Sequence, residues 1–207
     1  MMISRYMKTG LLSILATLLI VSGNTQAAGN ATAGKTKSMA CAGCHGPDGN
    51  SLMGTWPKLA GQHADYLAKQ LADFKSGARK EPTMTAMAAP LKPQDIADIS
   101  AYYASQSIKA GVADPALAKA GEKIYRAGNK ENGVAACMAC HGPAGTGNAA
   151  ANFPSLGGQQ ADYVAKALKD FRSGTRKNDN AKMMQDVAVK LSDAEIKAVA
   201  AYVSGLH

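Results

Sequence analysis

The five-residue pattern Cys-x-x-Cys-His occurs twice in this chain of 207 residues, first at Cys41 and again at Cys137. All four cysteines of the sequence lie in these two motifs. Two thiols three residues apart can form thioethers to the two vinyl groups of one porphyrin, and the histidine that follows can reach the iron, which is the pattern of c-type haem attachment. The sequence therefore predicts two covalently bound haem c groups, attached through Cys41, Cys44, Cys137 and Cys140, with His45 and His141 as iron ligands.

Three other uses of paired cysteines explain less of this pattern. A redox dithiol uses Cys-x-x-Cys without needing a histidine directly after it. A four-cysteine zinc site would have to join pairs that lie 96 residues apart, and it would leave both histidines unexplained. Disulfides suit an exported protein but predict no repeated histidine. We therefore favour haem attachment.

Residues 1–27 are typical of a cleaved export signal. Arg5 and Lys8 give a positively charged start, residues 11–21 form a mostly apolar run, and Thr25-Gln26-Ala27 offers small residues at the cleavage positions. The apolar run is too short for a membrane span, which needs about 20 residues. We expect cleavage after Ala27, a mature chain with no spanning segment, and a location in the periplasm, either free or peripheral at the inner membrane.

The chain is moderately basic, with 23 Lys and Arg against 15 Asp and Glu. Two of the basic residues lie in the leader, and the remaining excess divides equally between residues 28–113 and 114–207. No basic run is interleaved with aromatic residues, so the sequence predicts no nucleic-acid partner. We interpret the charge as a solvated surface whose modest positive field can steer the protein toward an acidic partner or a membrane surface.

The chain is also a tandem duplication, a feature that decides the domain organisation. The block that begins Trp56-Pro-Lys-Leu-Ala-Gly-Gln recurs as Phe153-Pro-Ser-Leu-Gly-Gly-Gln, and the likeness continues for a further fifteen residues. Gly111 and Pro115 interrupt the helical pattern between the copies. We predict two domains, residues 28–110 and 111–207, each wrapped around one haem.

Each copy predicts an all-α domain. The first helix should run into the haem motif, and the second should span residues 64–76 and 161–173, where apolar residues recur at helical spacing. Gly77 and Gly174 then stand where a helix end favours glycine. The last helix should begin at Pro93 in the first copy, and after a capping box that starts at Ser192 in the second.

The repeat also indicates the second ligand of each iron. The mature chain offers two further histidines and several methionines. His63 corresponds to Gln160 and His207 is the terminal residue, so we interpret both as surface histidines. With the last helices aligned, Met84 matches Met184, whereas no other methionine recurs. Both should lie in a loop before the final helix and close the far side of the haem, although methionine also serves as core filler.

A ligating histidine usually donates its other ring N–H to a carbonyl or a carboxylate. Pro57 lies 12 residues after His45, and Pro154 lies 13 after His141. A proline carbonyl is a reasonable acceptor, because proline stiffens the loop without adding a competing donor. From spacing alone, an ordinary loop proline is an equal alternative.

Taken together, these residues resemble the dihaem cytochrome c4 family. The resemblance covers both haem motifs, Gly46-Pro-Asp-Gly-Asn50, the aromatic-Pro-x-Leu-x-Gly-Gln of both copies, Ala116-Leu-Ala-Lys-x-Gly-Glu122, and the ending Tyr202-x-x-Gly-Leu-His207. It implies two tandem class I cytochrome c domains with Met and His ligands, which carry over to Met84 and Met184, and it supports Pro57 and Pro154 as partners of the histidines. It also implies that the two haem edges face each other. The short segment 78–83 before Met84 departs from the family pattern.

The function that follows is electron transfer without catalysis. The resemblance implies a periplasmic dihaem shuttle between respiratory-chain partners, an upstream donor and a membrane-bound terminal oxidase. An alternative is the electron-accepting cytochrome subunit of a flavoprotein dehydrogenase. A dihaem peroxidase ranks lower, because it needs an iron that is open or can open, and the matched methionines argue against that.

Overall fold

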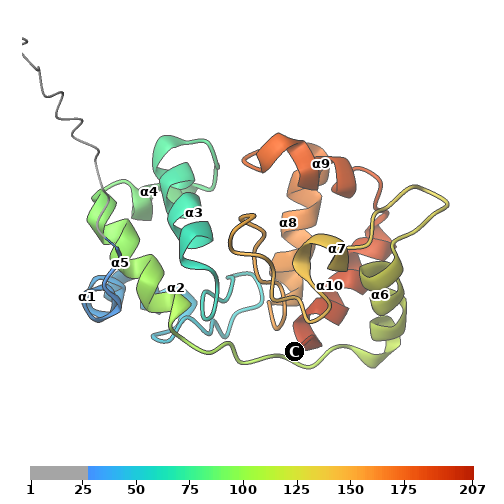
Figure 1. Ribbon diagram of the computed structural model, residues 1–207, viewed down its shortest axis with the longest axis horizontal. Coiled ribbons are helices and arrows are strands. Elements are labelled where there is room, and N and C mark those ends of the chain that lie inside the picture. Colours follow the sequence, from blue (N-terminus) through green and yellow to red (C-terminus); the bar gives the residue numbers. More distant parts are fainter. Residues whose placement is uncertain (1–27) are drawn as a thin grey trace, which may run out of the picture.

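The computed structural model describes residues 28–207, so the predicted leader lies outside the described residues. Helices of the first half and of the second half form two groups that lie side by side (Figure 1). The first group comprises α1 (Ala31–Lys37), α2 (Met39–His45), α3 (Ala64–Ser76), α4 (Pro82–Ala88) and α5 (Pro93–Ala104). The second comprises α6 (Pro115–Ala127), α7 (Met138–His141), α8 (Ala161–Ser173), the 3-10 turn η1 (Asn180–Lys182), α9 (Met183–Ala188) and α10 (Asp193–Gly205).

Helices α3 and α8 match their predicted bounds. Both bury one side against their own half, with Phe74 at 5% and Phe171 at 7% exposure. Each ends at a glycine in the left-handed conformation, Gly77 with φ +78° and Gly174 with φ +74°. Glycine reaches this conformation without a Cβ clash, so it terminates the helix at the predicted position.

Helices α5 and α10 also begin where the sequence predicts. Pro93 opens α5, and its ring fixes the backbone angle that the first helical turn needs. At α10 the capping box forms as expected, with the Ser192 hydroxyl accepting from the Glu195 backbone N–H and the Glu195 carboxylate accepting from the Ser192 N–H.

The first helix of each half crosses the last helix of the same half at a glycine. A Cβ built on Gly34 would lie 2.0 Å from the Asp98 carbonyl oxygen, and one built on Gly121 would lie 2.1 Å from the Ala198 carbonyl oxygen. No side chain fits in such a contact. The glycines therefore allow α1 to pack on α5 and α6 on α10, which brings the beginning and the end of each half together.

Two separate apolar cores result. One gathers around Leu67, Ile99 and Tyr103, and the other around Tyr125 and Ile196. Among residues 28–207, the only strand-like pairings are isolated bridges, and every helix-to-helix contact stays within one half. The predicted all-α class, with one core in each half, is confirmed. An extended stretch between α5 and α6 joins the two halves.

Two local predictions were wrong. In the second half the first helix does not run into the haem motif, because Gly128 adopts φ +68° and ends α6, and a bridged turn from Asn129 to Val134 follows. Met84 and Met184 lie on the short helices α4 and α9 rather than in loops. Each short helix begins where a carboxylate accepts hydrogen bonds from its first N–H groups, a device that apolar periodicity does not reveal.

Candidate haem sites

The first haem motif lies on a single short helix. Cys41 and Cys44 belong to α2, and His45 is its last residue, with only 6% of its surface exposed. Gly46 then turns the chain with φ +80°, and its N–H bonds to the Ala42 carbonyl. The two thiols and the imidazole are therefore presented from one helical turn, as attachment to a single porphyrin requires.

The second motif repeats this arrangement on α7. His141 is again the last helical residue, again 6% exposed, and Gly142 follows with φ +77°. The helix is shorter than α2 because its first turn is replaced by the bridged loop that precedes Cys137.

Both histidine rings are oriented by the predicted prolines. The His45 Nδ1 atom lies 2.8 Å from the Pro57 carbonyl oxygen, and the His141 Nδ1 atom lies 2.9 Å from that of Pro154. A carbonyl can only accept, so Nδ1 carries the proton and Nε2 keeps the lone pair that a metal ligand needs. Burial lowers the pKa of both imidazoles more than the carbonyl contact raises it. Both rings are thus held neutral, with the tautomer suited to iron.

One cysteine of each haem motif packs against the core of its own half. Cys41 packs on the first core and Cys137 on the second, so the two pairs do not share a site. Burial raises the pKa of the Cys41 thiol, and it raises that of Cys137 to about 11. A redox dithiol needs a lowered thiol pKa. The surroundings therefore disfavour a dithiol and suit thiols consumed in thioether bonds to an apolar macrocycle.

The recurring methionines occupy matching positions in the two halves. The Met84 N–H donates to the Glu81 carboxylate at 2.7 Å, and the Met184 N–H donates to the Asp179 carboxylate at 2.9 Å. Both methionines are half-buried. Their neighbours Met87 and Met183 are 38% and 40% exposed. In each half of the described residues, the methionine that recurs in the repeat is less exposed than the nearby methionine that does not recur.

Two tyrosines that sequence reasoning did not single out support the haem motifs. The Tyr102 hydroxyl donates to the Pro47 carbonyl at 2.7 Å, and the Tyr125 hydroxyl donates to the Gly142 carbonyl at 2.7 Å. Each fixes the turn just after its histidine. They come from different helices, α5 and α6, so no alignment of the repeat reveals the equivalence.

His63 is not the surface histidine that we expected. Its side chain is half-buried, and its Nε2 atom is buried without a hydrogen-bond partner among the described residues. Its counterpart Gln160 instead donates across to the Ser51 carbonyl at 2.6 Å. His207 is exposed, as predicted.

The two halves meet through side chains that pair across the boundary, a region that we call the interdomain seam. Gln62 accepts from the Ser155 N–H at 2.9 Å and donates to the Ser155 carbonyl at 2.8 Å. Gln159 makes the same pair of bonds with Lys58, at 2.8 and 2.9 Å. Ser155 and Lys58 directly follow the two prolines that orient the histidines. The loops that support the imidazoles therefore form part of the seam.

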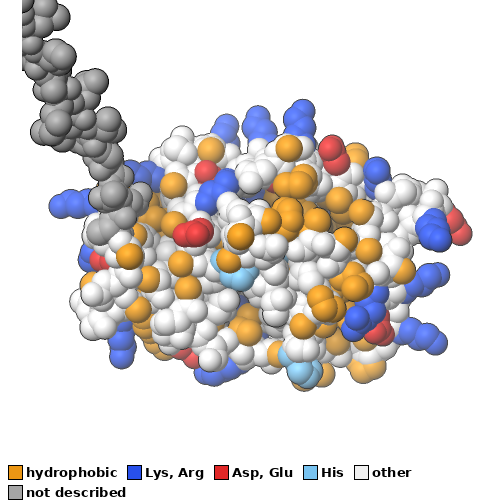
Figure 2. All heavy atoms as spheres, viewed as in Figure 1, with side chains coloured by type: hydrophobic (Ala, Val, Ile, Leu, Met, Phe, Trp, Pro, Cys, Tyr) orange, Lys and Arg blue, Asp and Glu red, His pale blue; other side chains and the backbone are white. Residues whose placement is uncertain are grey.

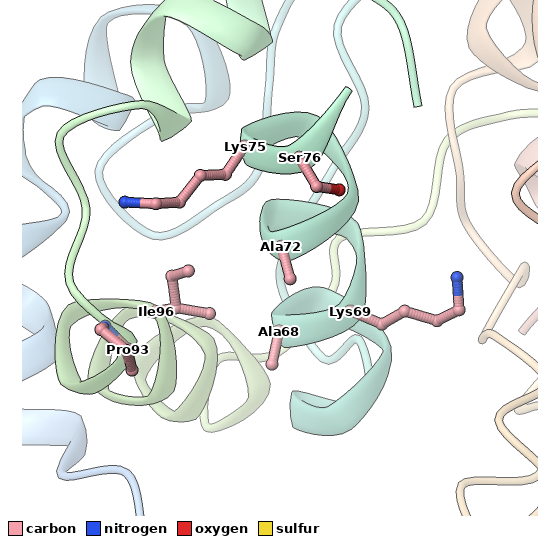
Figure 3. Close-up of a pocket in the computed structure, with 7 residues that line it drawn as sticks. All are labelled: Ala68, Lys69, Ala72, Lys75, Ser76, Pro93 and Ile96. Atoms are coloured by element: carbon pink, nitrogen blue, oxygen red, sulfur yellow. The ribbon is translucent and has the colours of Figure 1, made fainter. Parts of the chain in front are cut away.

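One groove of the described residues lies away from these side chains. Figure 3 shows it between α3 and α5, with Ala68 and Ala72 on one side and Pro93 and Ile96 on the other. Its volume is about 630 Å³, and no residue predicted to bind haem lines it. The Lys75 ammonium reaches from α3 to the Ala89 carbonyl at 2.9 Å. The groove is a feature of the packing between two helices.

The residues present fit a covalent haem in each half. Each half joins a thiol pair whose first member packs on an apolar core, a neutral buried histidine, and a half-buried methionine on a separate short helix. Together with the helix crossings, this geometry defines a c-type cytochrome domain built twice in one chain.

Comparisons with known proteins agree. The family model for cytochrome c matches residues 31–107 and 118–207. Cytochrome c4 of Pseudomonas aeruginosa is 50% identical over 95% of this chain and 98% of its own length. The crystal structure of reduced recombinant cytochrome c4 from Pseudomonas stutzeri matches with a TM-score of 0.85 and 50% identity, covering 87% of this chain and 100% of that one. A thiosulfate dehydrogenase electron acceptor of Stutzerimonas stutzeri is 41% identical over 80% of this chain and 78% of its own length.

The chain belongs to the cytochrome c family, and within it to the dihaem cytochromes c4. It carries two covalently bound haem c groups and is an electron-transfer cytochrome. None of the helices between residues 28 and 207 combines the length and apolarity needed to cross a membrane.

Proposed function

We propose that this protein is a periplasmic electron carrier, with no catalysis of its own, that takes electrons from an upstream donor protein and delivers them to a membrane-bound terminal oxidase. One observation carries the proposal. Both halves supply the same set of groups, a histidine held by a proline carbonyl and a methionine on a carboxylate-capped helix. Methionine opposite histidine gives a closed, high-potential iron. In this proposal, neither half has an open iron for a small substrate.

In this proposal, Cys41, Cys44, Cys137 and Cys140 attach the haems, and His45, Met84, His141 and Met184 ligate the irons. The haem supplies a reversible one-electron change at its iron. The protein's part is to hold the ligands in place. Pro57 and Pro154 fix the imidazoles, and Glu81 and Asp179 fix the start of the helices that bear the methionines. Ligands fixed in this way keep the same geometry in both oxidation states.

The surface supports transient contact with protein partners. Lysine and arginine side chains are spread around the rim of the visible face, and hydrophobic side chains gather nearer its centre (Figure 2). Met87 and Met183, next to the proposed ligands, are among the exposed apolar residues. An apolar centre within a charged rim is the usual anatomy of a protein-binding surface, and the rim charges mainly govern the rate of encounter.

A second candidate is the electron acceptor of a dehydrogenase. The sequence alternative was an acceptor for a flavoprotein dehydrogenase. The similarity to the thiosulfate dehydrogenase electron acceptor favours a dehydrogenase partner more generally. A dihaem peroxidase ranks below both, because its chemistry needs an iron that is open or can open.

The test is to mix the reduced holoprotein rapidly with washed membranes that contain the terminal oxidases of the source cells. We expect oxidation of both haems at a rate that rises with oxidase content and falls with ionic strength. Stable co-elution of the native protein with a dehydrogenase on size exclusion would instead support the acceptor role. Rapid oxidation by hydrogen peroxide alone would support the peroxidase. The protein should appear in the osmotic-shock fraction, and a salt wash should release any portion held at the inner membrane.

A further inference from the structure

Two arginines at equivalent positions of the repeat cross the interdomain seam in opposite directions. The Arg79 Nη2 atom lies 3.2 Å from the Tyr163 hydroxyl of the second half, and the Arg176 Nη2 atom lies 2.8 Å from the Tyr66 hydroxyl of the first half. Both guanidiniums also reach the Gln70 Oε1 atom, at 2.8 and 3.2 Å. The two nitrogens that share this oxygen are therefore at most 6.0 Å apart (2.8 Å plus 3.2 Å).

These two positive charges lack anionic partners. Their hydrogen-bond acceptors are tyrosine hydroxyls and amide oxygens, and neither arginine forms a salt bridge with a carboxylate of the described residues. Arg176 is only 7% exposed. The nearby carboxylate of Asp73 is paired with Lys69 at 2.5 Å and accepts from Asn178 at 2.6 Å. The cluster thus retains two excess positive charges, one buried and one half-buried, and water screens the buried charge of Arg176 little.

The positive charge of this cluster lowers the pKa of the Tyr163 hydroxyl. Burial raises the pKa of its hydroxyl, but Arg79 and Arg176 outweigh burial and hold the pKa at about 8. A phenol held so far below its usual pKa of about 10 shows that the surroundings favour a negative charge.

The two arginines are also close in sequence to both proposed methionine ligands. Arg79 comes five residues before Met84, and Arg176 comes eight residues before Met184. On the histidine side, the loops that hold Pro57 and Pro154 meet the seam through Gln159 and Gln62. The segments leading to both axial ligands of each haem therefore face the same boundary. A haem carries its two carboxylates, the propionates, along one edge.

We propose that Arg79 and Arg176 hold propionates of the two haems at the interdomain seam and couple the reduction potentials of the two irons. The proposal rests on the haem ligand set proposed above. The arginines act as positioning residues. Their guanidiniums fix carboxylates through charge-assisted hydrogen bonds, and each positive charge disfavours the oxidised iron, which carries one more positive charge than the reduced iron. Because each arginine spans the seam, its removal should lower the potentials of both haems.

The test is a redox titration of the holoprotein carrying Arg79→Gln or Arg176→Gln, with Lys80→Gln and Lys177→Gln as matched controls. The control lysines are the next residues in each copy, and both are exposed. We expect each arginine variant to lower the reduction equilibrium constant of both haems about tenfold, which is 59 mV for a one-electron couple. The loss should persist in 1 M salt, where the screening length is about 3 Å. In 1 M salt, the two lysine control variants should have nearly the same reduction potentials as the unmutated protein.

Conservative variants separate charge from structure. Arg79→Lys and Arg176→Lys keep the charge, so they should restore most of the potential. Arginine variants whose potentials match those of the lysine controls would overturn the proposal, even if they weaken the contact between the halves. If a glutamine variant fails to accumulate with haem, a crystal structure of the unmutated holoprotein shows whether the two arginines contact the propionates. Carboxylate oxygens within about 3 Å of the guanidiniums support the proposal, and separations beyond hydrogen-bond range overturn it.

Failure of the ligand set is a distinct result. Carbon monoxide binding by the unmutated reduced protein would reject the closed sites of the proposed carrier, whatever the arginine variants do. Unchanged potentials together with closed sites would reject only the role of the arginines.

Discussion

Gln62 and Gln159 hold equivalent positions in the two halves, and the side-chain amide of each pairs with both the backbone N–H and the carbonyl of one residue of the other half. Both side chains are buried, at 7% and 6% exposure. The residues that they bind, Ser155 and Lys58, directly follow the prolines that orient the haem histidines. The loops that join the two halves therefore also support the iron-ligating histidines.

Gln62→Ala or Gln159→Ala should weaken this contact. Each substitution leaves the backbone N–H and carbonyl of a half-buried residue without these partners, at a cost of about 1–3 kcal/mol. We expect a loss of unfolding free energy in that range in denaturant titrations, or a separation of the transition into two steps. Lys197→Ala, at an exposed position on α10, serves as the control. Stability equal to that of the control would contradict the account of the seam.

The proposed iron ligands can be separated from their neighbours on the same short helices. Met84→Ala and Met184→Ala should each open one iron, so that carbon monoxide binds half of the haem in the reduced protein. Met87→Ala and Met183→Ala replace exposed methionines and should leave both irons closed. Visible spectra of the reduced protein with and without carbon monoxide give the readout. Opening by a control substitution, or closed sites in both Met84→Ala and Met184→Ala, would reject the ligand set.

The helix crossings predict where a single methyl group is not tolerated. Gly34→Ala would place a Cβ 2.0 Å from the Asp98 carbonyl oxygen, so α1 must move away from α5. Overpacking of this kind costs about 1–3 kcal/mol. Gly43→Ala is the control, because its Cβ meets nothing within 4 Å and the second haem motif has Ala139 at that position. The midpoints of thermal unfolding should be measured for the Gly34→Ala and Gly43→Ala holoproteins. Equal midpoints would count against the close crossing of α1 and α5.

Asp98 should contribute to acid sensitivity. The Asn30 backbone N–H, Lys37 and Gln94 hydrogen-bond its carboxylate and lower its pKa from 3.8 to about 2. Because the folded-state pKa is depressed, the stabilisation is complete well above pH 3.8 and is lost as the pH falls toward 2. Asp98→Asn should therefore be less stable than the unmutated protein at pH 6, and the difference should shrink on acidification.

Denaturant titrations between pH 6 and pH 2 measure this difference. Thr83→Ala, at an exposed position on α4, provides the comparison, because it removes no titratable group. A constant difference between Asp98→Asn and the unmutated protein across this range would reject the role of Asp98.

The sequence predicted those features that depend on local chemistry. The bounds of α3 and α8 follow from apolar spacing ended by Gly77 and Gly174, and the start of α10 follows from the capping box at Ser192. The helices at Met84 and Met184 were missed, because they have at most two turns and depend on the carboxylates of Glu81 and Asp179. The seam was missed for another reason. Gln62 and Arg176 recur in the repeat, but recurrence does not say that a residue's partner lies in the other copy.

The most direct test of the account is the visible absorption spectrum of the full holoprotein in three states: oxidised, reduced, and reduced under carbon monoxide. The account predicts two low-spin c-type haems per chain whose reduced spectrum carbon monoxide does not change, because methionine closes both irons. Carbon monoxide binding to either haem would contradict the paired ligand set and, with it, the carrier function.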